Sequence, residues 1–212
     1  MSRITLFCGH YGSGKTNIAI NYAVRLRREG KAVTLFDLDI VNPYYRSKDS
    51  SDLLRQEGIE LVASDYANTN VDTPALPGDM YRVTDETDRF AVVDVGGDDR
   101  GALALGRLTP AIIAEGDYDM LFVCNFMRPL TRTPEEALGV MREIEAACGI
   151  PFTGIVNNTN LGKDTVRSDI DRSKEKIEHL CEESGLPLRF TCAESGIARK
   201  NELALTLQKT IW

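Results

Sequence analysis

Residues 9–16 read Gly-His-Tyr-Gly-Ser-Gly-Lys-Thr, between an apolar run at 4–8 and a helical apolar pattern at 17–28. The spacing G-x-x-x-x-G-K-[ST] between a strand and a helix is that of a phosphate-binding P-loop. The glycines allow the backbone to curl until successive N–H groups point inwards. The helix that follows adds its N-terminal amides and its dipole. The stretch therefore predicts a site for a polyphosphate.

Two side chains of this stretch have expected roles in the chemistry. We expect Lys15 to reach the β- and γ-phosphates and Thr16 to offer its hydroxyl to Mg²⁺. The alternative is a chance match on a glycine-rich turn, and the strand before it and the helix after it argue against that. The residues expected to line the nucleotide here are Gly9, His10, Tyr11, Gly12, Ser13, Gly14, Lys15, Thr16 and Asn17.

The composition is that of a globular protein with an acidic surface. The 212 residues are enough for one well-cored domain, which we place at 1–212. A net charge of −7 argues against a general nucleic-acid binder. No apolar run approaches a membrane span, and the chain enters a strand too early for a signal peptide. The five cysteines form no C-x-x-C pair, so we expect free buried thiols and a cytoplasmic protein.

Strand and helix patterns alternate along the chain. This alternation predicts an α/β fold of the three-layer P-loop NTPase type, a mostly parallel twisted sheet with helices on both faces. A loop is expected at 65–80, and the helix at 101–115 is expected to break or restart near Pro110. Strands are predicted at 4–8, 31–36, 60–63, 89–94, 118–125, 152–157 and 189–192, and helices at 17–28, 52–56, 101–115, 133–148, 164–183 and 195–212.

Three carboxylates follow buried strands. Asp94 closes an apolar strand, and residues 94–97 read D-x-x-G, which predicts a magnesium carboxylate followed by an amide, that of Gly97, for the γ-phosphate. A helix cap is the alternative role for Asp94. Asp39 is the candidate for ordering the attacking water or the water shell of the metal, so we assign it with Lys15 to catalysis and with Thr16 and Asp94 to the metal. Asp37 is closer to its strand and is the structural alternative.

These motifs resemble, in order and spacing across nearly the whole chain, those of the MinD/ParA/CobQ group of P-loop ATPases. The resemblance implies an ATP–Mg²⁺ site in which Asp39 matches the switch I aspartate and residues 94–97 match switch II. It also implies that Asn157, after a late strand, reads the adenine edge, with plain turn chemistry as the alternative. The run 157–160 has no carboxylate to accept from guanine, which favours ATP over GTP.

One position departs from this group. The group carries a lysine at the position of His10, and that lysine reaches across a dimer to the partner's nucleotide. Histidine is shorter and largely neutral near pH 7, so a nucleotide-dependent homodimer stays an open expectation. Leu203, Leu207 and Ile211 lie at helical spacing near the C-terminus. The few basic residues around them favour docking onto the domain rather than onto a membrane.

Three functions follow from the motifs. The first is a Mg²⁺-dependent ATPase whose nucleotide switches residues 40–50 and 94–105 and which acts on a partner protein. The second is an ATP-dependent ligase or small-molecule kinase of the CobQ and dethiobiotin-synthetase type, with Arg46 and Arg82 clamping an anionic substrate. The third is a nucleotide-binding regulator with negligible catalysis.

Overall fold

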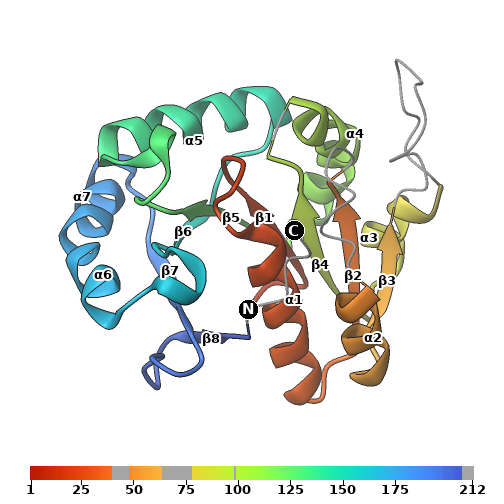
Figure 1. Cartoon of the computed structure of the whole chain (residues 1–212). Helices are drawn as coiled ribbons and strands as arrows, with labels where there is room; N and C mark the ends of the chain where they lie inside the picture. Colours follow the sequence, from red (N-terminus) through yellow and green to blue (C-terminus); the bar gives the residue numbers. More distant parts are fainter. Residues whose placement is uncertain (40–47, 64–77, 98, 207–212) are drawn as a thin grey trace.

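The computed structural model describes residues 1–39, 48–63, 78–97 and 99–206, and these residues form one eight-stranded parallel sheet in the order β3-β2-β4-β1-β5-β6-β7-β8 (Figure 1). Every adjacent pair in this order is parallel. The α/β fold expected from the alternating patterns is therefore confirmed. The strands are β1 Ile4–Cys8, β2 Val33–Leu38, β3 Glu60–Ala63, β4 Phe90–Val95, β5 Tyr118–Cys124, β6 Gly154–Asn157, β7 Leu188–Glu194 and β8 Leu203–Leu205.

Helices cover both faces of the sheet and bury two separate apolar cores. One core lies between the sheet and α1 and α2, and the other lies between the sheet and α3, α4, α5 and α7. The α-helices are α1 Lys15–Arg28, α2 Lys48–Gln56, α3 Arg82–Asp85, α4 Asp99–Glu115, α5 Pro134–Cys148, α6 Arg167–Arg172 and α7 Lys174–Ser184, and the 3₁₀ helices are η3 Gly78–Tyr81, η4 Pro129–Thr131 and η5 Gly162–Asp164.

Alternate residues of the central strands face opposite layers, as the two-residue period of a strand requires. In β1, Leu6 and Cys8 belong to the core under α4 and α5, whereas Phe7 belongs to the core under α1. All three are at most 1% exposed. A strand that is buried on both faces reads as a continuous apolar run, which is why β1 is recognisable in the sequence.

The strand order fixes where the loops meet. β1 lies between β4 and β5, so the loops after these three strands share the carboxyl edge of the sheet. Asp37 of β2 pairs in register with Asp94 of β4, and Asp94 pairs with Phe7 of β1. The arrows of β2 and β3 point to this edge at the top of Figure 1. The parallel order therefore gathers the sequence motifs at one edge.

Two helix predictions are wrong in their interiors. α4 runs through Pro110 without a break. Proline has no N–H to donate to the carbonyl one turn earlier, but Pro110 lies on the exposed face of the helix, where water can donate to that carbonyl instead. The single helix predicted at 164–183 is instead η5, α6 and α7. The break is at Ser173, whose hydroxyl bonds back to the Ile170 carbonyl at 2.7 Å and competes with the helical pattern.

The C-terminal helix predicted at 195–212 is also wrong where the structure describes it. Leu203 and Leu205 are 3% and 2% exposed with an exposed Ala204 between them, so they form the two-residue pattern of β8. β8 pairs with β7 and its leucines join the core under α1. Leu207 and Ile211, which suggested a helix, lie outside the described residues, as do Arg46 and most of the loop expected at 65–80.

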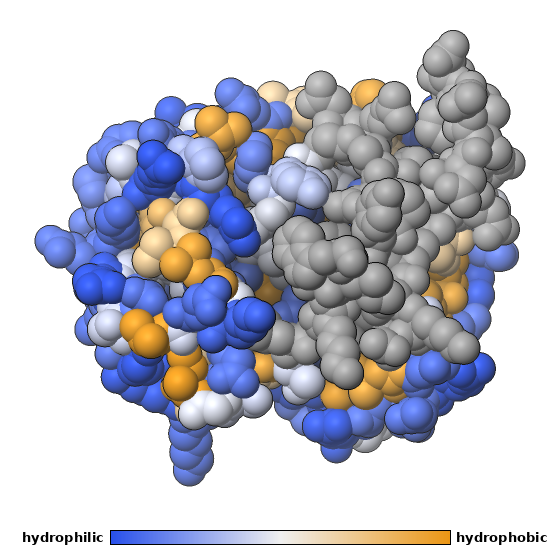
Figure 2. Space-filling model, viewed as in Figure 1, coloured by the Kyte–Doolittle hydropathy of each residue, from blue (hydrophilic) through white to orange (hydrophobic). Residues whose placement is uncertain are grey.

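The described surface is largely polar. On the face drawn in Figure 2, blue residues surround small, separate orange areas. None of the helices in the described ranges has the length and apolar character needed to cross a bilayer. All five cysteines are free thiols, and four of them are buried, as expected for core residues.

Candidate functional site

The P-loop of residues 9–16 has a backbone that only glycine accepts at several positions. Gly12 and Gly14 have φ values of +77° and +92°, in the left-handed region. A Cβ on Gly9 would lie 2.6 Å from the Val123 carbonyl oxygen, and a Cβ on Gly14 would lie 2.3 Å from Nδ2 of Asn158. The loop is therefore held tightly between β1, β5 and the segment after β6.

Lys15 begins α1 and points its ammonium into the P-loop. It is 5% exposed, and Nζ donates to the His10 carbonyl at 3.4 Å. A Cβ on Gly97 would lie 2.8 Å from Lys15 Nζ and 2.8 Å from the backbone nitrogen of Tyr11. The glycine of the D-x-x-G motif therefore rests directly on the P-loop, which brings together two motifs that are 80 residues apart.

Asp94 is a buried carboxylate beside the start of α1. Burial, followed by the charge of Asp37, raises the pKa of Asp94 to about 7. The Lys15 ammonium and a hydrogen bond from the Thr16 hydroxyl act in the opposite direction, and Asp39 adds a smaller upward effect. A carboxylate held at this pKa is poised to exchange its proton for a cation near neutral pH.

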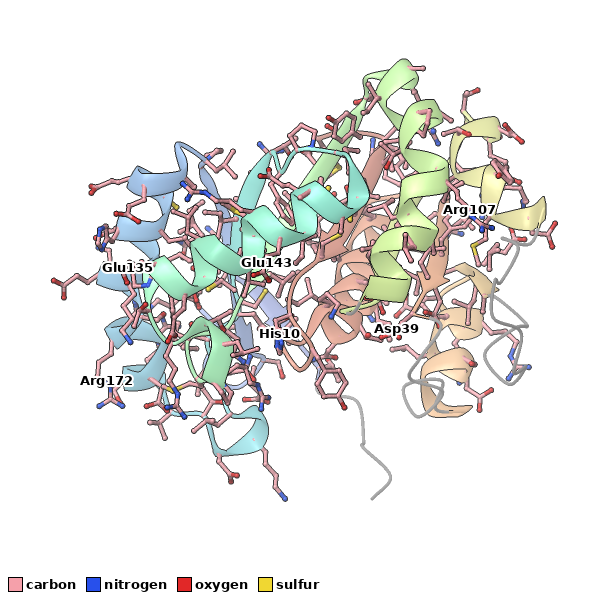
Figure 3. All side chains as sticks on the ribbon, turned by 90° about the horizontal axis from the view of Figure 1, so that it is seen from above. His10, Asp39, Arg107, Glu135, Glu143 and Arg172 are labelled. Atoms are coloured by element: carbon pink, nitrogen blue, oxygen red, sulfur yellow. The ribbon has the colours of Figure 1, made fainter. Side chains whose placement is uncertain are left out.

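Asp37 and Asp39 lie together at the end of β2. The backbone amide of Asp39 donates to Oδ1 of Asp37 at 2.9 Å, and both side chains are half-buried. A Cβ on Gly96 would lie 3.4 Å from the Asp39 Cα and 3.5 Å from its Oδ1. Figure 3 looks onto this edge of the sheet and labels Asp39, after β2, and His10, after β1.

Three buried polar atoms in this region have no hydrogen-bond partner within the described chain, Ser13 Oγ, Asp94 Oδ1 and Arg128 Nε. Unsatisfied buried polar atoms are uncommon and call for a ligand, ion or water. Among the described residues, no group of three or more His, Cys, Asp or Glu side chains could hold a metal by itself. Mg²⁺ commonly takes one or two protein ligands and completes its shell with phosphate oxygens and water.

Asn157 is 2% exposed, and its amide is already bonded inside the protein. Its Nδ2 donates to Ser173 Oγ at 2.9 Å, and its Oδ1 accepts from the Thr159 hydroxyl at 2.8 Å. The turn chemistry that was the alternative role is therefore present, and adenine reading stays a prediction.

The neighbouring Asn158 contacts the P-loop and was missed from the sequence. Its Nδ2 donates to the Ser13 carbonyl at 2.7 Å in a buried position. The signal was the Asn-Asn pair itself, because adjacent residues at a strand end point in opposite directions. In the structure, Asn157 bonds to Ser173, between α6 and α7, and Asn158 bonds to the P-loop.

The remaining expected residues have partners close to them in the chain or in the sheet. His10 Nδ1 lies 3.0 Å from the Tyr11 carbonyl oxygen, and Tyr11 is 64% exposed. Asn17 accepts from Asn21 through its carbonyl at 2.7 Å and its side chain at 3.1 Å. Arg82, expected as an anion clamp, forms ion pairs with Glu60 and Glu86 instead.

No family model matches the chain, and no curated protein matches it by sequence. Solved structures do match. FtsY of Thermotoga maritima has a TM-score of 0.65 and 17% identity over 90% of this chain and 61% of that one. Chloroplast FtsY of Physcomitrella patens has a TM-score of 0.63 and 19% identity over 93% and 60%. The signal recognition particle 54 kDa protein of Aeropyrum pernix in complex with GDP has a TM-score of 0.58 and 16% identity over 89% and 40%.

The chain spans about three fifths of the two FtsY chains and two fifths of the 54 kDa protein. At these identities the likeness shows the fold, which is the α/β fold of P-loop NTPases. The resemblance to the MinD/ParA/CobQ group rests on the motifs alone.

Proposed function

We propose that this chain is one nucleotide-binding domain, residues 1–212, that binds and hydrolyses a nucleoside triphosphate with Mg²⁺ as a conformational switch. One observation carries the proposal. The buried Asp94, which accepts from Thr16, and Gly97, which touches Lys15, converge on the P-loop. Phosphate donors, a metal carboxylate and a backbone amide for the γ-phosphate are the parts that phosphoryl transfer needs.

Each residue has a distinct task. The Lys15 ammonium and the amides of the P-loop hold the phosphates, and the Thr16 hydroxyl and Asp94 hold Mg²⁺. Bound Mg²⁺ supplies positive charge that neutralises the phosphate oxygens. Asp39 positions the attacking water through its carboxylate. Gly97 has no side chain, so its backbone can approach the phosphates closely.

We propose ATP as the nucleotide. The run 157–160 offers amides and a hydroxyl but no carboxylate for the guanine N1–H and amino group. GDP is bound in the 54 kDa protein, but at 16% identity this says nothing about the base that this chain binds. In a competition assay, ATP is expected to displace a fluorescent nucleotide at a lower concentration than GTP. Equal or stronger displacement by GTP contradicts this choice.

The switch is proposed to act on a partner protein, or on a second copy of the chain. The support is the position of Tyr11, which is 64% exposed while its backbone nitrogen lies against Gly97. A γ-phosphate that accepts a hydrogen bond from the Gly97 amide would shift the contact between Gly97 and Tyr11 and change the surface at Tyr11. A partner that binds there would sense the nucleotide.

The proposal is tested by replacing the lysine of the P-loop. Lys15→Ala removes the one ammonium inside the loop, so the affinity for ATP–Mg²⁺ is expected to fall about tenfold to a hundredfold, as measured by titration calorimetry. The exposed Lys200→Ala makes the same chemical change outside the site and is expected to leave affinity unchanged. If Lys15→Ala binds ATP–Mg²⁺ as tightly as the unmodified protein, the proposal fails.

A further inference from the structure

The loop between β5 and α5 places an arginine against the P-loop. A Cβ on Gly12 would lie 3.6 Å from Nε of Arg128, 3.8 Å from its Cζ and 3.9 Å from its Cδ. A side chain at Gly12 would therefore be in van der Waals contact with the guanidinium, which lies beside the part of the P-loop that has no side chain. β5 is the sheet neighbour of β1, which explains why this loop meets the P-loop.

The backbone that carries Arg128 is fixed by hydrogen bonds on both sides. Its amide donates to the Asn125 carbonyl at 3.1 Å, and its carbonyl accepts from the Thr131 amide at 3.2 Å. The Thr131 hydroxyl donates to the same Asn125 carbonyl at 2.7 Å. Asn125 itself is 1% exposed and donates to the Asn160 carbonyl at 3.1 Å. Arg128 is thus held by a rigid scaffold, which lowers the entropy lost when it binds a ligand.

One nitrogen of the Arg128 guanidinium, Nε, has no acceptor among the described residues. This nitrogen is buried, and none of the ion pairs formed by the described residues includes Arg128. A buried charged donor without an acceptor is unfavourable unless something else supplies one. The other cation at the P-loop, Lys15, lies inside it.

We propose that Arg128 is a second cation for the phosphates of the nucleotide, supplied by the same chain from the loop after β5. This inference rests on the proposed function. A guanidinium presents several N–H donors in a plane and suits phosphate oxygens. Its position beside Gly12 adds a positive group from outside the P-loop.

The test measures binding rather than turnover. Titration calorimetry compares the unmodified protein with Arg128→Ala, Arg128→Lys and Arg132→Ala, using ATP–Mg²⁺ and inorganic tripolyphosphate–Mg²⁺ as separate ligands. Arg132 is exposed and belongs to the same loop, so it is the matched control. Arg128→Ala is expected to weaken both ligands about tenfold. Arg128→Lys is expected to recover part of the loss, and Arg132→Ala to leave both affinities unchanged.

Each other result has a defined meaning. If Arg128→Ala binds both ligands as the unmodified protein does, the inference is overturned while the proposed function stands. If ATP binding falls but tripolyphosphate binding does not, Arg128 contacts the sugar or base, and the phosphate role is overturned. If the Ala and Lys variants lose binding and unfold at a lower temperature alike, Arg128 is structural. If the unmodified protein binds neither ligand, the proposed function itself fails.

Discussion

The ends of β1, β5 and β6 and the ends of β2 and β4 meet at one edge of the sheet, but they differ in chemistry. The first group, which we call the phosphate side, consists of residues 9–16, Arg128 and Asn158, and it is rich in donors and cations. The second, the carboxylate side, consists of Asp37, Asp39 and Asp94. Both sides have hydrogen bonds and close glycine contacts, but the carboxylate side also gathers like charges.

The two sides differ in which hydrogen-bonding partners their buried polar atoms lack. Among the described residues, the phosphate side has two buried donor atoms without acceptors, Ser13 Oγ and Arg128 Nε. The carboxylate side has an acceptor at Asp94 without a donor, and burial with the neighbouring Asp37 raises its pKa. In the proposed function, a polyphosphate would supply acceptors to the first half, and its Mg²⁺ would supply positive charge to the second. The Thr16 hydroxyl already donates to Asp94 across the two sides. One ligand would satisfy the buried atoms on both sides that this contact leaves without partners.

Gly14→Ala should have the largest effect, on the phosphate side. The alanine would have to keep the left-handed φ of Gly14, which strains its backbone. Its Cβ would also displace the Asn158 amide from the Ser13 carbonyl. Left-handed strain and a broken buried hydrogen bond together should lower the free energy of unfolding by about 2–4 kcal/mol. Chemical denaturation followed by circular dichroism measures this change.

Gly30→Ala is the matched control for that variant. Gly30 also has a positive φ, +85°, but nothing lies within 4 Å of the added Cβ. It should therefore lose only about 1 kcal/mol, from backbone strain alone. Equal losses at the two positions would show that the Asn158 contact contributes nothing to the phosphate side.

Asp94→Asn should have a smaller effect of opposite sign, on the carboxylate side. At pH 8 the unmodified protein buries this charge, so its removal should raise the free energy of unfolding by on the order of 2 kcal/mol. The same variant should lose the gain in ATP affinity that Mg²⁺ gives, because the metal carboxylate is gone. Denaturation without nucleotide and calorimetry with and without Mg²⁺ measure the two effects.

The pH dependence fixes the sign of this prediction. The folded pKa of about 7 lies above the ordinary value of 3.8, so the folded state binds more protons than the unfolded state between these values. Asp94 therefore makes the unmodified protein less stable as pH rises from about 4 to about 7, with no further change above. The gain in Asp94→Asn should shrink towards pH 5. A gain that grows towards low pH would contradict the origin of the raised pKa.

The sequence predicted those parts of the fold whose signals are local. The buried strands are continuous apolar runs, and α5 begins with Thr133 and Pro134, where the Glu136 amide donates to the Thr133 hydroxyl at 3.2 Å. The P-loop spacing and the aspartate that ends β4 were likewise readable. β8 was not, because Leu203 begins both a helical and an alternating pattern, and only its burial beside β7 decides between them.

The candidate site was less readable where its contacts join distant segments. Arg128 follows β5 without a motif, and its contact with Gly12 depends on β5 pairing with β1. Asn157 and Asn158 are alike in sequence, yet one bonds to Ser173 and the other to Ser13. The break at Ser173 belongs to the same network. Such contacts follow from strand order and register, which local patterns do not specify.

The most direct measurement is a crystal structure of the protein with Mg²⁺ and a non-hydrolysable ATP analogue. We expect the triphosphate to lie within the P-loop between the Lys15 ammonium and Gly97, with the metal on the Thr16 hydroxyl facing Asp94. The account is contradicted if the analogue binds elsewhere and the P-loop holds no phosphate. It is also contradicted if the metal lies far from Thr16, because one ligand would then not bind both sides.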